Sequence, residues 1–194
     1  MQTRVETLRG EAIEAHLDAL AGLRIAVFRD WPYLYDGDAN YERDYMRAYA
    51  APGAVVVGAF DGDRMVGAAT AARMEDHSDD FAAAFADHRW PLAEIYYLAE
   101  SVLLPRYRGH GLGHAFFEAR EAAGRAAGRR YAAFCSVTRP DDHPARPESA
   151  RTHDAFWRGR GYAPLDGVVA SFAWKDVGDT TATRKKLQFW GKTL

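Results

Sequence analysis

The chain has 194 residues, of which 48% are hydrophobic and 27% charged, and its formal net charge is -2 at pH 7. This length and composition predict one folded domain over residues 1–194 with a sizeable core. The small negative charge and the absence of a long basic run argue against a nucleic-acid partner, and no apolar run approaches the roughly 20 residues of a membrane-spanning helix.

The apolar periodicity changes along the chain and predicts both strands and helices. Asn40 is expected to cap the second helix, and Asp61-Gly62-Asp63 to turn a hairpin. In chain order we expect a strand at 3–8, a helix starting near residue 13, a helix at 40–50, hairpin strands at 54–60 and 64–73, a short helix at 76–87, a strand at 93–104, a helix from 112 to about 128, a strand at 130–137, a helix at 149–160, a strand at 168–174, and a strand or extended tail at 185–192. This order predicts a mixed α/β sheet covered by helices.

One stretch carries the clearest chemical signal: Leu103-Leu104-Pro105-Arg106-Tyr107-Arg108-Gly109-His110-Gly111-Leu112-Gly113. Pro105 ends the preceding strand because it has no N–H to donate to a neighbour. The three glycines can adopt positive φ, so successive N–H groups can converge at the start of the next helix. Such groups, helped by the helix dipole, bind anionic oxygen. The sequence therefore predicts a pyrophosphate site, with Arg106 and Arg108 beside it.

The spacing within this loop narrows the choice of phosphate ligand. The loop fits neither a dinucleotide fingerprint nor a Walker loop. Arg108, Gly111 and Gly113 instead form R-x-x-G-x-G between an apolar strand and a helix. In this the chain resembles the GCN5-related N-acetyltransferase (GNAT) superfamily. The segment Phe156-Trp157-Arg158-Gly159-Arg160-Gly161-Tyr162 is similar to the F-Y-x-x-x-G-F/Y pattern of that family. An ordinary glycine-rich turn is the alternative.

The resemblance implies a fold and a cofactor. The expected fold is α/β and GNAT-like, with a mixed, mostly antiparallel central sheet that is splayed between its fourth and fifth strands and flanked by helices. The expected acyl donor is acetyl-CoA, whose pantetheine arm would enter the gap between those strands. The Leu103 N–H is expected to donate to the thioester oxygen. The residues expected to bind the cofactor are Leu103, Leu104, Arg108, Gly109, His110, Gly111, Leu112, Gly113 and Trp157.

Glu100 is the candidate catalytic base. Acyl transfer to an amine requires that the acceptor loses a proton and that the thioester carbonyl is polarised. Glu100 lies on the expected central strand among apolar neighbours. Partial burial there would raise the pKa of its carboxyl group toward that of a useful base. The alternative is a solvent-facing or ion-paired carboxylate, and Glu94, at the outer end of the strand, is a weaker candidate.

The general acid for the leaving thiolate stays open. The resemblance places a tyrosine where this chain has Trp157, and an indole N–H is not acidic near neutral pH. Ser136, His153 and Tyr33 are alternatives, as is unassisted departure of the thiolate. Trp157 would then pack on pantetheine or fill the core.

The acceptor is expected to be an amine. Residues 28–38 are dense in aromatic residues and carboxylates, which attract cations. We expect Tyr33, Tyr35 and Glu100 to contact this substrate, and packing of the tyrosines in the core is the alternative.

Together these observations predict an acetyl-CoA-dependent N-acetyltransferase that acts on a primary amine of a small molecule or protein by direct transfer in a ternary complex. The alternatives are a catalytically silent CoA-binding module, an acyltransferase with an O-acceptor or a longer acyl-CoA, and, ranked lower, a nucleotide-binding protein. No metal is expected, because the His110 and His114 pair lacks the glutamate of H-E-x-x-H. The polar N-terminus lacks a signal-peptide core, so we expect a cytoplasmic protein without membrane partners. A homodimer stays open.

Overall fold

The computed structural model describes residues 3–77 and 79–194. Its strands are β1 (Thr3–Leu8), β2 (Val55–Asp61), β3 (Arg64–Arg73), β4 (Ile95–Tyr97), β5 (Ser101–Leu103), β6 (Tyr131–Thr138), β7 (Ala163–Trp174) and β8 (Thr183–Thr193). Its α-helices are α1 (Glu11–Glu14), α2 (Leu17–Phe28), α3 (Ala39–Arg47), α4 (Asp79–Ala84), α5 (Leu112–Ala126) and α6 (Asp154–Gly159). Short 3-10 helices are η1 (Ala48–Ala50), η2 (Met74–Asp76), η3 (Leu92–Glu94) and η4 (Pro105–Tyr107).

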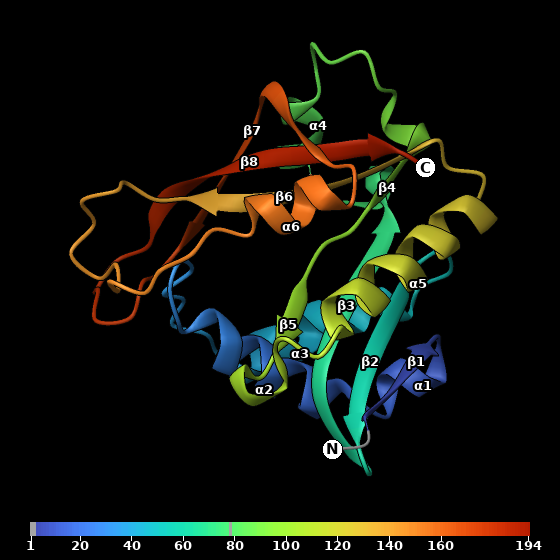
Figure 1. The fold of residues 1–194 in the computed structure, drawn as a ribbon, viewed down its shortest axis with the longest axis horizontal. Coiled ribbons are helices and arrows are strands. Elements are labelled where there is room, and N and C mark those ends of the chain that lie inside the picture. The colour runs from blue at the N-terminus through green and yellow to red at the C-terminus, as the bar shows by residue number, and fades with distance from the viewer. Residues whose placement is uncertain (1–2, 78) are drawn as a thin grey trace.

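The strands form one sheet in the order β1-β2-β3-β4-β6-β8-β7, and β5 also pairs with β3 (Figure 1). Every neighbouring pair is antiparallel except β4 and β6, which are parallel. A parallel pair needs a crossover connection, and α5 provides it. The predicted mixed, mostly antiparallel sheet is therefore confirmed.

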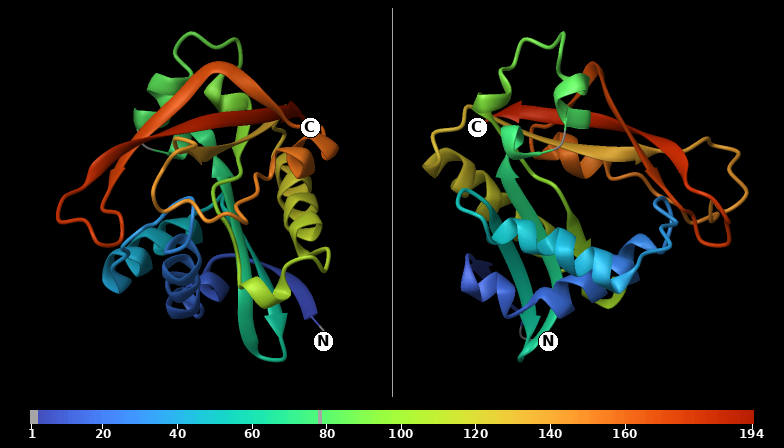
Figure 2. Two further views of the ribbon diagram at one scale, coloured as in Figure 1. Left: turned by 60° about the vertical axis from the view of Figure 1, so that its left-hand side comes forward. Right: turned by 180° about the vertical axis from the view of Figure 1, so that it is seen from behind.

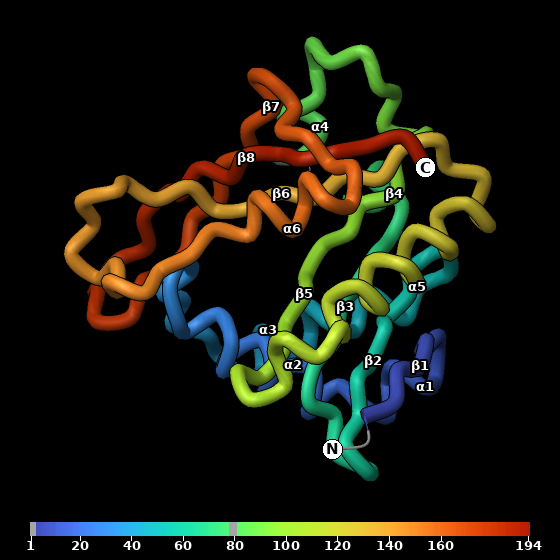
Figure 3. The backbone as a smooth tube through the Cα atoms, viewed as in Figure 1, coloured from blue at the N-terminus to red at the C-terminus, as the bar shows by residue number. Residues whose placement is uncertain are grey.

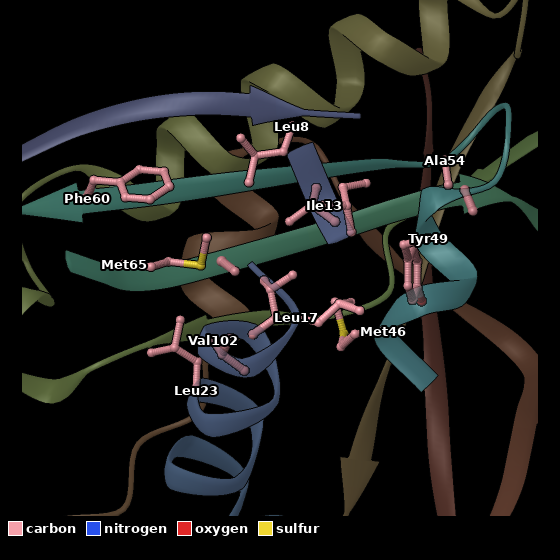
Figure 4. Close-up of a cluster of buried hydrophobic side chains, with 14 of the residues drawn as sticks. Leu8, Ile13, Leu17, Leu23, Met46, Tyr49, Ala54, Phe60, Met65 and Val102 are labelled. Atoms are coloured by element: carbon pink, nitrogen blue, oxygen red, sulfur yellow. The ribbon is translucent and has the colours of Figure 1, made fainter. Parts of the chain in front are cut away.

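Helices cover both faces of the sheet. Helices α5 and α6 lie on the face toward the viewer in Figure 1, and α1 to α4 lie on the other, as the rear view in Figure 2 shows. Strand β2 is buried along nearly its whole length because it is covered from both sides. The core under α1 to α3 gathers apolar side chains from these helices and the hairpin strands, including Ile13, Leu17, Met46 and Val102 (Figure 4).

The sheet opens in its middle. Strands β4 and β6 stay paired as far as Leu98, whose N–H donates to the carbonyl of Ala133 at 2.8 Å. Beyond this point β5 remains with β3, whereas β6 remains with β8, and the two strands diverge (Figure 3). Because β4 and β5 together form the fourth strand of the sequence prediction and β6 forms the fifth, the predicted splay is confirmed.

A β-bulge divides the central strand, which the sequence predicts as continuous. Ala72 of β3 pairs with Tyr97, but Ala69 pairs with Ser101, so three steps along β3 correspond to four along its partner. Thr70 lies opposite both bulged residues, since its carbonyl accepts the Ala99 N–H and its N–H donates to the Glu100 carbonyl, each at 3.0 Å. A bulge bends a strand and re-aims a side chain, and here it does so at Glu100.

Three other expectations need adjustment. The first helical run is divided into α1 and α2. Asp38, rather than Asn40, caps α3, because its carboxylate accepts the N–H groups of Asn40 at 3.0 Å and Tyr41 at 2.9 Å. Helix α6 starts later than predicted, at Asp154. The C-terminal segment is a strand, β8, held between β6 and β7.

Candidate active site

The glycine loop places a row of unused N–H groups at the start of α5. Gly109 and Gly111 both have φ of 81°, which turns the chain into the helix. Among residues 3–77 and 79–194, the N–H groups of residues 109–113 make no hydrogen bond. A Cβ atom built on Gly109 or Gly111 would meet nothing within 4 Å, so the space beside these two glycines is open. The loop has the geometry of an anion site.

Arg108 differs from the rest of the loop. Its N–H donates to the carbonyl of Pro105 at 3.1 Å, so it is not part of the free row. Its guanidinium Nε donates to the carbonyl of Leu103 at 3.0 Å. The predicted row of N–H groups over residues 108–113 is therefore corrected to residues 109–113, and Arg108 contributes positive charge at the end of β5.

The backbone of β5 faces the opening at Leu103. The N–H of Leu104 donates to Val66 at 3.0 Å, which ties Leu104 to β3. Because alternate residues of an antiparallel strand point their backbone groups to opposite sides, the Leu103 N–H points away from β3, toward the gap. Leu103 is thus placed to bind a group in the opening through its backbone, and Leu104 is not.

Glu100 is buried and fully engaged. Its carboxylate accepts hydrogen bonds from the hydroxyls of Tyr45, at 2.6 Å, and Thr70, and it forms an ion pair with Arg24. Burial raises the pKa of the Glu100 carboxyl, but Arg24, these two hydroxyls and His77 together bring the pKa below its usual value. The expectation of a raised pKa is therefore wrong, and the ion-paired alternative holds. The apolar neighbours on the strand raise the pKa of Glu100 as expected, but Arg24 of α2 and the hydrogen-bonded hydroxyls lower it by more.

Arg24 links Glu100 to a second buried carboxylate, Glu42 of α3. The Arg24 guanidinium also lies over the rings of Tyr45, at 4.3 Å, and Phe28, at 5.0 Å. Glu42 has no exposed surface, and its Oε1 has no hydrogen-bond partner among the described residues. The guanidinium of Arg24 therefore lies between the carboxylates of Glu42 and Glu100.

A second buried arginine, Arg120 of α5, holds the bulge from the other face of the sheet. Its guanidinium donates to the carbonyls of Thr70, Glu100 and Phe116 and to the hydroxyl of Ser101, at 2.9–3.2 Å. Burial without a carboxylate partner lowers the pKa of Arg120 to about 10. Helix α5 therefore fixes both the glycine loop and the strand that carries Glu100.

The loop between α2 and α3 walls the opposite side of the opening. Arg139, just after β6, donates to the carbonyls of Pro32 at 2.9 Å and Tyr33 at 2.7 Å, and it pairs with Asp176 at 2.7 Å. The Tyr33 ring packs on Phe28, 4.5 Å between centroids. Burial, together with the nearby carboxylate of Glu42, raises the pKa of Tyr35. Both predicted tyrosines thus lie near the buried carboxylates, but they also pack in the core.

Sequence analysis missed Arg139, Asp176, Arg24 and His77. No local spacing identifies them, because each is joined to the site by contacts between distant segments. Only Arg24 carried a signal in its residue type, as a cation within the mainly apolar run of residues 17–28.

Trp157 is half-buried and packs against the core. Its ring lies 5.0 Å from that of Phe134 and 5.1 Å from that of Trp190. Glu94 pairs with Arg130 at 2.9 Å, at the outer end of the strand. His114 contacts the Phe156 ring and the Arg160 guanidinium. Within the described ranges, no three His, Cys, Asp or Glu side chains are grouped to hold a metal.

Comparison with known proteins agrees with this geometry. The family model described as Acetyltransferase (GNAT) family matches residues 22–148. The chain belongs to this family and is therefore an acyltransferase by class, as the resemblance predicted. No curated protein matches the sequence.

Solved structures share the fold at low sequence identity. An acetyltransferase from Streptococcus agalactiae has a TM-score of 0.63 and 17% identity, over 99% of this chain and 98% of its own. A ribosomal-protein-alanine N-acetyltransferase from Brucella melitensis has a TM-score of 0.62 and 15% identity, over 100% of both chains. An aminoglycoside 6'-N-acetyltransferase complexed with coenzyme A has a TM-score of 0.62 and 15% identity, over 98% of this chain and 96% of its own. Across the described part of the present chain, no helix has the length and apolar character needed to cross a membrane.

Proposed function

We propose that the protein is an N-acetyltransferase that uses acetyl-CoA and transfers the acetyl group directly to a primary amine in a ternary complex. The observation that carries this proposal is the row of unpartnered N–H groups at residues 109–113, beside the opening between β5 and β6. The coenzyme A bound to the structurally similar aminoglycoside acetyltransferase supports the choice of donor.

The chain supplies two groups for the donor. The loop N–H groups and the α5 dipole would bind the pyrophosphate. The outward-facing N–H of Leu103 would donate to the thioester oxygen, where negative charge develops as the acceptor attacks. One such donor is worth about 10²–10³ in rate in well-studied acyl-transfer enzymes.

The buried charges favour an amine as acceptor over an alcohol. Glu42 and Glu100 both contact Arg24, so this interior holds two carboxyl groups for one guanidinium. A cation that enters beside Glu100 gains electrostatic stabilisation in a low-dielectric site, whereas a neutral hydroxyl gains much less. We propose that Glu100 attracts and orients the acceptor, together with Tyr33 and Tyr35.

A two-stage experiment tests the function. Thermal-shift titration should show stabilisation by acetyl-CoA but not by ATP or NAD. Release of free thiol is then measured with a polyamine, an aminoglycoside, free amino acids and a peptide with a free α-amino group. We expect thiol release with at least one amine and none with matched alcohols. Binding without thiol release would instead indicate a silent CoA-binding module, and faster reaction with a longer acyl-CoA would change the donor.

A further inference from the structure

We propose that His77 accepts the proton that the acceptor amine loses as it attacks the thioester. This inference rests on the proposed function and assigns the proton acceptor that Glu100 was expected to be. His77 follows η2 and contacts Tyr49, whose hydroxyl lies beside that of Tyr45, the hydrogen-bond donor to Glu100.

The position of His77 is fixed by aromatic contacts. Its ring lies 4.8 Å from that of Tyr97, 6.1 Å from that of Tyr49 and 5.7 Å from that of Phe81, measured between centroids. Tyr97 is the last residue of β4, immediately before the strands diverge at Leu98. The imidazole therefore lies beside the point where the gap between the two strands begins.

A short chain of hydroxyls joins this place to Glu100. The Tyr45 hydroxyl donates to Glu100 at 2.6 Å and lies 3.3 Å from the Tyr49 hydroxyl, and Tyr49 contacts His77. The imidazole Nε2 is buried and has no hydrogen-bond partner among the described residues. A buried nitrogen without a hydrogen-bond partner costs free energy. An amine N–H that donates to this nitrogen would remove that cost.

Glu100 is poorly suited to accept the proton itself. Arg24 and two hydroxyls already occupy its oxygens, and its pKa lies below the usual value. A base is most effective when its pKa is near the working pH. His77 meets this condition better, because an imidazole with an ordinary pKa of about 6.5 is mostly neutral at pH 7.

The charged surroundings of His77 are consistent with this role. Burial lowers the pKa of His77 and keeps the ring neutral, whereas Glu100 and Asp76 oppose this by stabilising the imidazolium. The other titratable groups packed against it are Tyr49 and Tyr97, and burial raises the pKa of both, so they stay neutral. Glu100 thus acts as the counter-ion for the proton that His77 receives.

The step balances without another reactant. The acceptor gives its ammonium proton to water and becomes a neutral amine. Its nitrogen then attacks the thioester carbon while one N–H proton moves to His77. The C–S bond breaks with its electron pair on sulfur, and the imidazolium returns the proton to the thiolate, directly or through water. The same histidine therefore fills the role of general acid that Trp157 leaves open.

The test compares His77→Gln with His88→Gln, a matched change at a half-buried histidine that contacts Phe85 and Trp90. A general base contributes about 10²–10⁴ in rate, so we expect His77→Gln to lower kcat at least about 100-fold. Affinity for acetyl-CoA and thermal stability should match those of His88→Gln. The wild-type kcat should fall at low pH as the imidazolium forms, and His77→Gln should lack this acid limb.

Two results would overturn the inference. One is a His77→Gln variant with wild-type kcat, and the other is an unchanged acid limb in that variant. If the variant does not fold, proton NMR of the wild type serves instead: the His77 imidazole must titrate at the pKa of the acid limb, and a mismatch rejects the assignment. A wild type that releases no thiol with any amine rejects the proposed function as well, which separates the two failures.

Discussion

The guanidinium of Arg120 lies 3.1 Å from the carbonyl oxygen of Glu100, on the opposite face of the sheet from that residue's carboxylate contacts. The same Nη1 atom lies 3.2 Å from the carbonyl of Thr70, so one cation holds both sides of the bulge. The α5 helix therefore controls where Glu100 points, although the two side chains do not touch.

Replacing Arg120 with Met should destabilise the fold. The change removes the guanidinium hydrogen bonds to three carbonyls and to the Ser101 hydroxyl, and hydrogen bonds from a charged group contribute about 1.5–3 kcal/mol each. Burial of the Arg120 guanidinium costs free energy, and this offsets part of what its hydrogen bonds contribute. We therefore expect a net loss of about 3 kcal/mol in the free energy of unfolding. Urea denaturation measures it, with the exposed Arg125→Met in the same helix as control. Equal stability of the two variants would show that the bulge does not depend on Arg120.

Gly111→Asp should abolish binding of acetyl-CoA. A side chain at φ of 81° is strained, and the carboxylate would project into the open space beside the loop. Gly128→Asp is the matched control, since Gly128 also has positive φ, at 71°, and open space around it. Calorimetry should give a Kd raised at least about 100-fold, or about 2.7 kcal/mol, for Gly111→Asp alone. Similar affinities for the two variants would contradict the anion site.

Glu100→Gln should lower turnover and leave the affinity for acetyl-CoA near that of the wild type. The amide keeps the shape of the side chain but removes the negative charge that faces the acceptor and His77. We expect kcat to fall about tenfold or more, and the acid limb of the pH profile to move to lower pH because the imidazolium loses its counter-ion. Steady-state kinetics from pH 5 to about pH 9 would measure both. An unmoved limb would mean that Glu100 and His77 are not coupled.

Acid should destabilise the protein through its buried carboxylates. Burial raises the pKa of Glu100, Glu121 and Asp176, but arginine and lysine partners outweigh it, so the pKa of each is lowered in the fold. A group whose folded-state pKa is depressed stabilises the fold above its unfolded value, about 4, and this contribution is lost as the pH falls below it. Urea denaturation should therefore show a falling free energy of unfolding below about pH 4.5.

The same measurement on Glu100→Gln gives the control. This variant should lose less stability than the wild type between pH 5 and about pH 3, because one of the contributing carboxylates is gone. Glu11→Gln, at an exposed position of α1, should behave like the wild type. If the free energy of unfolding fell equally with pH in all three proteins, the pKa of Glu100 would not be lowered in the fold.

Trp157→Phe should retain most of the activity. The indole packs on Phe134 and Trp190, so its loss should cost about 1–2 kcal/mol in stability. If the indole is no proton donor, kcat should stay within about tenfold of the wild type. A fall of several orders of magnitude, with the fold intact by circular dichroism, would assign Trp157 a direct part in the reaction.

The glycine loop and most strands were predictable because their signals are local. Positive φ at Gly109 and Gly111, the stop at Pro105 and the Asp-Gly hairpin each depend on a few adjacent residues. The splay followed from the family resemblance, and the bulge beside it was not predicted, because a register shift depends on two strands at once.

The electrostatics of the site could not be predicted in the same way. The pKa of Glu100 is set by Arg24, which lies far away in the sequence on another element, and the apolar strand neighbours alone point in the wrong direction. His77 lies in a short connection without periodicity, and only the packing of Tyr49 and Tyr97 against it shows its place. Such contacts are properties of the folded chain.

The hydrogen bonds of Arg139 to the loop between α2 and α3 have a consequence for how the two substrates meet. The halves of the sheet are joined at one end of the gap by β4 and β6, and at the other by the contacts of Arg139 with Pro32 and Tyr33. Because the gap is held at both ends, the two halves of the sheet cannot swing apart to widen it. Under the proposed direct transfer, we therefore expect donor and acceptor to enter from opposite faces of the sheet and to be bound at the same time.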